Sequence, residues 1–360
     1  MKAFCFESPG HAGFCEVPEP TLQGRPYGAI IRPVAVAPCS SDVHTVFGGG
    51  SPKAPDLVLG HEAVGIVVGV GSFVRDFKAG DFVAVPAITP DWREVDIQNG
   101  NYGHAGAPFS GHKLGRSVPG VFAERFLVED ADTTLALIGP EISLKQALMS
   151  VDVVTTGFTG AEAADIRMGD TVCVIGTGPV GLMAIAGARL LGAARIIAVG
   201  SRPKGAELAR FYGASDVISY KEGDIAQQVL EMTRRRGTDS VVIAGGTDEV
   251  FTQAFEMVRY GTGTVSNVNY FGGTGVLGFP KFSGGRGMAG KTLHTSLAKG
   301  GRARLERIFE MIRYGRLDPA PLVTHVLEGF DSIGPALMLM KDKPDSLVKV
   351  MVKISEVRND

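Results

Sequence analysis

Three residue types in the first half of the chain are those of a catalytic metal site. The run Gly60-His61-Glu62 precedes an expected strand, with Cys39 upstream and Asp152 downstream. A thiolate, an imidazole and a carboxylate suit a zinc ion that keeps one coordination position open. Each residue also has an ordinary explanation, as a core cysteine, a structural histidine or a helix-capping aspartate. Residue type and spacing alone leave both interpretations open.

A second stretch, Gly176-Thr-Gly178-Pro-Val-Gly181, has the spacing of a phosphate-binding turn. The β-branched run 172–175 is typical of a buried strand, and a helix is expected from residue 179. The first glycine allows a tight turn, the second lets a pyrophosphate approach the backbone, and the third lets helix pack on strand. Free N–H groups at the helix start, at Val180 among others, would then face the anion. Such a turn can also be purely structural.

The composition indicates a globular chain that acts on a small molecule. Its 360 residues, 44% of them hydrophobic, suffice for two domains, and a net charge of −2 offers no basic surface for nucleic acid or anionic lipid. Cys5, Cys15, Cys39 and Cys173 are too few and too scattered for a disulfide scaffold, which suggests a reducing compartment. The sequence shows neither a signal peptide nor an apolar run of membrane-spanning length, so we expect a cytoplasmic protein.

The elements that would position these groups show two different secondary-structure patterns along the chain. Up to about residue 86, strand-like runs such as 29–37, 63–70 and 82–85 alternate with glycine and proline turns, which predicts a barrel-like β unit. Residues 87–120 are irregular, and so long a loop is uncommon unless it lines a site or an interface.

Beyond residue 153 the pattern changes to strands alternating with helices, which predicts a doubly wound parallel sheet. The strands that follow the glycine turn are expected at 195–199, 216–219, 240–244 and 263–268. A last strand at 348–354 falls outside this alternation, so we expect it to return to the first domain.

Taken together, the two patterns resemble the zinc-containing medium-chain alcohol dehydrogenases, whose signature begins Gly-His-Glu and is followed by a nucleotide domain. The stretches that are similar to the NADP-dependent secondary alcohol dehydrogenases of this family are Val85-Pro-Ala-Ile-Thr-Pro-Asp-Trp92, Val154-Thr-Thr-Gly-Phe158, Ala198-Val-Gly-Ser-Arg202, Asn267-Val-Asn-Tyr270 and Leu339-Met-Lys-Asp-Lys-Pro344. The resemblance implies a GroES-like zinc domain at 1–153 and 297–360, an NADP-binding Rossmann domain at 154–296, and commonly a homotetramer.

The same resemblance implies that Cys39, His61 and Asp152 hold one catalytic zinc, and that Glu62 joins them when substrate is absent. Liver-type relatives have a four-cysteine lobe for a structural zinc, but no cysteine lies between Cys39 and Cys173. We therefore expect one zinc per chain and no structural zinc.

The implied reaction is zinc-assisted hydride transfer between NADP(H) and a secondary alcohol or ketone. The alcohol proton would leave through Ser41, the cofactor ribose and His44. Alternatively, Ser41 caps a helix and His44 is a surface residue.

The residues after the strand 195–199 favour NADP over NAD. An acid that would bind the ribose 2′-hydroxyl is absent, and Gly200-Ser201-Arg202 takes its place. Glycine would leave room for a 2′-phosphate, Ser201 would donate a hydrogen bond and Arg202 a charge-assisted pair. The family adds Tyr220 as a further contact. The alternative is an ordinary helix N-cap with a solvated arginine.

The resemblance also places a substrate pocket beside the zinc, lined by Ser41, Ala87, His112, Tyr270, Leu297 and Ala298. The subgroup usually has a tryptophan at the position of His112 and a cysteine at that of Ala298. Because both changes remove volume from the wall, we expect bulky ketones to fit better than acetone.

Two other functions stay open at this point. A non-catalytic NADPH-binding protein of the same fold would lack the zinc ligands, and a polyol dehydrogenase would share the zinc but tend to prefer NAD.

Overall fold

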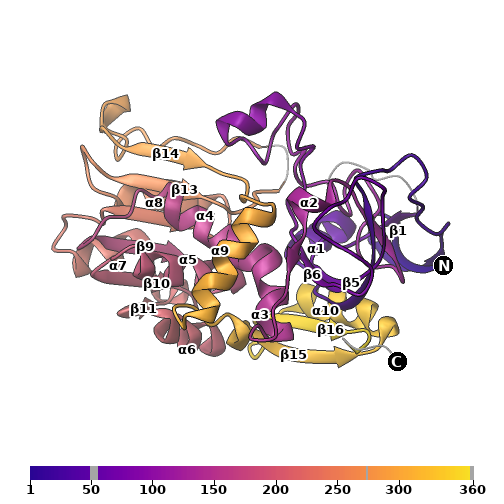
Figure 1. Cartoon of the computed structure of the whole chain (residues 1–360). Coiled ribbons are helices and arrows are strands. Elements are labelled where there is room, and N and C mark those ends of the chain that lie inside the picture. The colour runs from indigo at the N-terminus through magenta and orange to yellow at the C-terminus, as the bar shows by residue number, and fades with distance from the viewer. Residues whose placement is uncertain (49–55, 273–274, 357–360) are drawn as a thin grey trace. The chain divides into compact units, whose positions relative to one another are not determined.

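The computed structural model describes residues 1–48, 56–272 and 275–356, and the chain divides into two units (Figure 1). Unit 1 comprises Met1–Thr155 and Lys299–Asp360, and unit 2 comprises Thr156–Ala298. No helix in the described ranges is long and apolar enough to cross a membrane.

Unit 1 is built on a seven-stranded sheet of order β15-β16-β3-β5-β6-β8, with β7 also paired to β3. Its strands are β3 (Ala29–Val36), β5 (Ala63–Val70), β6 (Phe82–Val85), β7 (Phe126–Val128), β8 (Ala136–Leu137), β15 (Val323–Glu328) and β16 (Lys349–Lys353). The C-terminal strand β16 pairs antiparallel with β3. The prediction that the chain ends in the first unit is therefore confirmed.

A three-stranded sheet of order β2-β1-β4 completes the β structure described for unit 1. Its strands are β1 (Lys2–Ser8), β2 (His11–Glu16) and β4 (Leu57–Val58). Antiparallel pairing of β1 with β2 brings the Cα atoms of Cys5 and Cys15 to 6.1 Å, and the two residues form a disulfide. Cys39 and Cys173 are free thiols. The sequence analysis missed this pair, so the cysteine count no longer supports a reducing compartment.

Short helices connect the strands of unit 1. They are α1 (Ser40–Phe47), α2 (Ala131–Thr134), α3 (Leu144–Met149), α9 (Arg302–Arg313) and α10 (Ile333–Asp342), with 3₁₀ turns at Val95–Asn99, Ala320–Leu322 and Phe330–Ser332. A π-helical turn, η2 (Ser150–Val154), follows α3 directly. The core contains Ile31, Leu59, Phe122 and Leu135, all fully buried. The long stretch predicted as irregular, 87–120, contains one 3₁₀ turn, an isolated β-bridge between Leu114 and Val118, and otherwise bends, turns and coil.

Unit 2 contains a six-stranded sheet of order β11-β10-β9-β12-β13-β14, with all its strands parallel. The strands are β9 (Thr171–Ile175), β10 (Arg195–Val199), β11 (Asp216–Ile218), β12 (Ser240–Ile243), β13 (Thr264–Asn267) and β14 (Thr292–Thr295). The chain starts this sheet in the middle, at β9, and then builds outward on both sides. The order therefore reverses beside β9, where doubly wound sheets bind their ligands.

The helices of unit 2 alternate with these strands, as the sequence predicts. They are α4 (Thr155–Ala163), α5 (Pro179–Leu190), α6 (Pro203–Tyr212), α7 (Ile225–Met232) and α8 (Glu249–Met257), with 3₁₀ turns at Tyr220–Glu222 and Gly285–Gly287. Figure 1 shows β14, which the sequence analysis missed, as an outermost strand of this sheet. The expected architecture, a β-rich unit joined to a unit with a doubly wound parallel sheet, is confirmed by this topology.

Candidate active site

Four potential metal ligands gather inside unit 1. One ligand atom each from Cys39, His61, Glu62 and Asp152 lies within 4.8 Å of all the others. Cys39 follows β3, His61 and Glu62 directly precede β5, and Asp152 lies in η2. The structure thus brings together the four residues that the resemblance nominated as ligands.

Helix α1 holds Cys39 at its N-terminus. Cys39 is the N-cap residue, and its backbone N–H donates to Oδ2 of Asp42 at 2.8 Å in a capping box. Burial alone would raise the pKa of the Cys39 thiol, but the charge of Lys349 and a hydrogen bond with His61 together lower it below its usual value. A thiol with a lowered pKa is a ready thiolate ligand.

The imidazole of His61 lies between two carboxylates. Its Nδ1 is 3.4 Å from Oδ1 of Asp42, and its Nε2 is 3.7 Å from Oδ2 of Asp152. Burial lowers the pKa of His61, yet the charge of Asp42 and hydrogen bonds with its neighbours raise it well above the usual value. A carboxylate behind the far nitrogen is the arrangement that orients metal-binding histidines and leaves the other nitrogen for the ion.

Asp152 owes its place to a local break in helical geometry. Helix α3 begins with a capping box between Ser143 and Gln146, so the idea that Asp152 caps a helix is wrong. Asp152 instead lies inside the π turn η2, where Oδ2 is 3.8 Å from Sγ of Cys39. Single π turns within α-helices occur frequently at functional sites.

Glu62 makes the fourth corner of the cluster and is paired with a buried lysine. Its Oε1 accepts a hydrogen bond from Nζ of Lys349 at 2.6 Å, and the two side chains are 0% and 1% exposed. Burial raises the pKa of Glu62 well above its usual value, although the Lys349 charge opposes this. Its other oxygen, Oε2, is buried with no hydrogen-bond partner among the described residues.

Three further predicted residues lie near the cluster. Oγ of Ser41 is 3.2 Å from Nε2 of His61, and the His112 ring meets the His61 ring edge-on with centroids 4.8 Å apart. The backbone N–H of Ala87 donates to the carbonyl of Val151, the neighbour of Asp152. Ser41 is not the N-cap of α1, so its capping alternative is wrong.

The remaining predicted positions differ in their exposure. His44 is exposed on α1, yet partial desolvation of its ring, followed by the charge of Lys343, lowers its pKa. In unit 2, Tyr270 is exposed, Leu297 is half-buried and Ala298 is buried.

The glycine turn of unit 2 joins β9 to α5. Gly176 has φ +109°, a conformation that favours glycine, and a Cβ on Gly181 would lie only 1.9 Å from the carbonyl oxygen of Gly176. Around Gly178 the space is open, since an added Cβ would meet only Nη2 of Arg202 at 3.9 Å. Gly178 is the N-cap of α5, and Val180 lies in its first turn. An anion can therefore approach the helix start at Gly178.

The structure changes the explanation for Gly200. A Cβ there would lie 2.0 Å from Oγ1 of Thr177, so packing against the glycine turn already requires glycine at this position. This packing adds a second reason for glycine beside the expected room for a 2′-phosphate, which stays a prediction. Ser201 follows β10, Arg202 is the N-cap of α6, and Tyr220 is exposed in the turn after β11.

The donors and the turn fit the groups that they would hold. A thiol, an imidazole and two carboxylates, one with an orphaned buried oxygen, suit a divalent cation such as zinc. The open backbone at Gly178 suits a pyrophosphate.

Comparison with known proteins agrees with these features. The profile "Alcohol dehydrogenase GroES-like domain" matches residues 25–138, and "Zinc-binding dehydrogenase" matches residues 179–302. An NADP-dependent isopropanol dehydrogenase of Thermoanaerobacter brockii is 51% identical over 98% of this chain and 99% of its own. The chain belongs to the zinc-containing alcohol dehydrogenase family.

Other members of the alcohol dehydrogenase family extend the match. An NADP-dependent isopropanol dehydrogenase of Entamoeba histolytica is 48% identical over 98% of this chain and 96% of its own. The solved structure of the alcohol dehydrogenase TADH from Thermus sp. ATN1 is 30% identical, has a TM-score of 0.85, and is matched over 98% of this chain and 100% of its own.

Sequence reasoning missed two charged residues of this alcohol dehydrogenase site, Asp42 and Lys349. Asp42 had a readable signal, because an acid three residues after a helix N-cap often closes a capping box. Lys349 had none, since its partner Glu62 is 287 positions away in the sequence.

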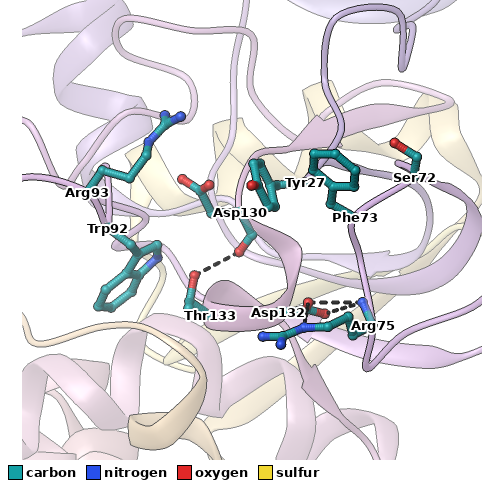
Figure 2. Close-up of a pocket in the computed structure, with 9 residues that line it drawn as sticks. All are labelled: Tyr27, Ser72, Phe73, Arg75, Trp92, Arg93, Asp130, Asp132 and Thr133. Carbon is teal, nitrogen blue, oxygen red and sulfur yellow. Dashed lines mark hydrogen bonds and ion pairs between the residues drawn. The ribbon is translucent and has the colours of Figure 1, made fainter.

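A cavity of about 750 Å³ in unit 1 has no cluster residue in its lining. Figure 2 shows Tyr27 and Phe73 on its wall, with ring centroids 5.3 Å apart, together with Trp92. The charged side chains of Arg93 and Arg75 pair within the unit, Arg93 with Asp91 and Arg75 with Asp132. We assign this cavity no role in the reaction.

Proposed function

We propose that this alcohol dehydrogenase interconverts secondary alcohols and ketones with NADP(H) as the hydride carrier. The observation that carries the proposal is the four-donor cluster of unit 1, found in a chain 51% identical to an NADP-dependent isopropanol dehydrogenase. Unit 1 would be the catalytic zinc domain, and unit 2 the NADP-binding domain.

One zinc ion per chain would be held by Cys39, His61 and Asp152, with Glu62 as a displaceable fourth ligand. When bound, zinc supplies Lewis-acid stabilisation of the alcohol or carbonyl oxygen. The thiolate and the Asp152 carboxylate balance its charge, while Asp42 keeps His61 oriented. A structural zinc is not proposed, because the sequence has no cysteine between Cys39 and Cys173.

Ser41 is proposed to accept the alcohol proton. Its Oγ is already within hydrogen-bonding distance of the cluster, 3.2 Å from Nε2 of His61. His44, three residues later on the same helix, is exposed and would receive the proton from Ser41 by way of the cofactor ribose and release it to water.

The cofactor would place its pyrophosphate at Gly176, Gly178, Val180 and Gly181, and its 2′-phosphate beside Ser201, Arg202 and Tyr220. Support comes from the guanidinium of Arg202, which lies 3.9 Å from the position of a Cβ on Gly178. Charge-assisted hydrogen bonds from this arginine would favour NADP over NAD.

The substrate is proposed to be a ketone with an aryl or long-chain substituent. The pocket would be formed by Ser41, Ala87, His112, Tyr270, Leu297 and Ala298, and His112 supports it because its ring lies 4.8 Å from the ligand His61. His112→Trp should shift kcat/KM toward acetone relative to an aryl methyl ketone by about tenfold, because one methylene of fit is worth roughly 1–3 kcal/mol. An unchanged ratio, or a wild type that prefers acetone, would refute the enlarged pocket.

We further propose a cytoplasmic homotetramer. Its support is the exposure of three large apolar side chains within residues 276–288 of unit 2: Val276, Phe282 and Met288 are 89%, 89% and 84% exposed. Apolar area of this kind commonly marks a protein interface. Sedimentation analysis would measure the assembly directly.

The function is tested by initial rates. Purified protein should reduce ketones with NADPH, lose that activity to a chelator, and regain it with zinc. NADPH binding without turnover would favour a non-catalytic binder, and a preference for NADH with sugar alcohols would favour a polyol dehydrogenase.

A further inference from the structure

Unit 1 buries a lysine against the metal cluster. Lys349 begins β16, its side chain is 1% exposed, and its Nζ is 2.6 Å from Oε1 of Glu62. Lysine is almost never fully buried unless it is paired. The buried ammonium of Lys349 therefore sets the electrostatic surroundings of the Glu62 carboxylate.

The two oxygens of Glu62 differ in their surroundings. Oε1 accepts the lysine hydrogen bond, whereas Oε2 is buried and has no hydrogen-bond partner within the described part of the chain. Glu62 also belongs to the group of donors that lie within 4.8 Å of one another. Oε1 is therefore paired with the Lys349 ammonium, and Oε2 is available to bind a metal ion.

Lys349 changes the net charge of the buried groups around the metal cluster. With His61 neutral, the thiolate of Cys39 and the carboxylates of Asp42, Asp152 and Glu62 carry −4, and a divalent ion supplies +2. With Lys349 the buried assembly carries −1, and without it −2, so loss of the ammonium leaves one more negative charge without a counterpart. An unpaired buried charge is strongly unfavourable.

We propose that Lys349 is a positioning residue that makes Glu62 a weak, displaceable zinc ligand. The inference rests on the zinc site of the proposed function. Because the ammonium holds Glu62 at Oε1, the carboxylate would keep a counter-charge whether or not Oε2 contacts the metal. Glu62 would therefore be able to give way to a substrate oxygen. Without the lysine, the zinc would be the only cation left for Glu62.

The decisive variants are Lys349→Met, Lys349→Arg and the double variant Lys349→Met with Glu62→Gln. A matched control is Lys353→Met, which removes an ammonium from the same strand, where it pairs with the exposed Glu356. Zinc loss to a chelator and the rise in Tm on zinc addition are measured for each, together with the visible spectrum of the cobalt-substituted protein.

Lys349→Met should lose zinc about tenfold more slowly or slower still, as expected when a charged partner is lost. Its Tm should rise more on zinc addition than that of the wild type, and its KM for alcohol should increase. A competing anion should perturb its cobalt spectrum less, because Glu62 keeps the fourth position. Lys349→Arg and Lys353→Met should resemble the wild type, and the double variant should lose zinc at least as fast as the wild type.

Zinc loss from Lys349→Met at the wild-type rate or faster would overturn the inference. So would slow loss that persists in the double variant, or failure of Lys349→Met to fold even with zinc, since the metal should replace the lost partner. A wild type that binds no zinc would instead overturn the proposed function.

Discussion

The metal cluster and the glycine turn are built by different means. The cluster collects side chains from stretches as far apart as Cys39 and Asp152, and with Lys349, the partner of Glu62, it places several charges in the interior of unit 1. The turn runs without interruption from Gly176 to Gly181, and the groups proposed to bind the cofactor there are backbone N–H groups at the start of α5.

This difference determines how each site should respond to substitution. In the cluster every group is electrostatically coupled to its neighbours, so a change of charge matters even when the shape is kept. In the turn no charge is buried, and the limiting factor is the space for a Cβ atom. Isosteric changes should therefore damage the first site, and small steric changes the second.

The largest effect is expected for Asp152→Asn. The amide keeps the shape of the carboxylate but removes its charge, so zinc occupancy and turnover should fall together. The loss should exceed the about 10- to 100-fold typical of residues that only support a ligand. Metal analysis and ketone reduction rates measure both quantities.

NADPH binding is the control for Asp152→Asn, because the glycine turn belongs to the other unit and should stay formed. Full zinc occupancy with normal turnover would remove Asp152 from the ligand set.

Gly178→Ala tests the turn by adding a single Cβ atom, as Asp152→Asn tests the cluster by removing a single charge. The added Cβ has only Nη2 of Arg202 nearby, at 3.9 Å, so the variant should fold normally. It would still occupy the space through which the pyrophosphate approaches, and a displacement of about 1 Å can cost on the order of 100-fold in kcat/KM. Initial rates measure the loss in kcat/KM, and fluorescence titration with NADPH measures the accompanying loss of affinity.

Two glycines give the comparison for Gly178→Ala. Gly278→Ala, at an open surface position, should change nothing, whereas Gly181→Ala should fail to fold correctly because of its 1.9 Å contact. Normal NADPH affinity in Gly178→Ala would mean that the turn is only structural.

The sequence predicted more of the glycine turn than of the metal cluster. The glycine turn follows from local spacing, and β5 and β10 have the predicted bounds because their apolar runs are continuous and end at glycines. The edge strand β14 was missed, since all four of its residues are exposed and leave no apolar pattern. The proposed ligands Cys39 and Asp152 became recognisable only through the family resemblance.

The buried charges and close contacts could not be predicted from local sequence. Lys349 reads as an ordinary surface lysine at the start of a strand, and only the pairing of β16 with β3 brings the C-terminal segment into unit 1. The steric need for Gly200 likewise depends on Thr177, which lies on the neighbouring turn of unit 2.

Arg202→Gly should have an intermediate effect. A charged hydrogen bond is worth about 1.5–3 kcal/mol, so kcat/KM for NADPH relative to NADH should fall about 10- to 100-fold. Adding Gly200→Asp is not expected to improve the change, because its Cβ would clash with Thr177. Steady-state kinetics with both cofactors decide the point, and an unchanged ratio would argue for a solvated arginine.

The smallest effect concerns pH, and it should arise in unit 1. Burial, and secondarily the charge of His61, lowers the pKa of His112 from 6.5 to about 4. Between pH 4 and pH 6.5, the imidazole of His112 binds a proton more readily in the unfolded chain than in the folded protein. The stability contributed by a neutral His112 is therefore complete above pH 6.5 and is lost as the pH falls toward 4. Between pH 7 and pH 5 this amounts to about 2 kcal/mol.

Urea unfolding of the metal-free wild type and of His112→Gln at both pH values isolates the contribution of His112, because the other titrating groups are common to both proteins. The wild type should lose about 2 kcal/mol more than the variant on acidification. Equal losses would mean that His112 is solvated, and a His112 that titrates normally would also weaken its assignment as a wall of the substrate pocket.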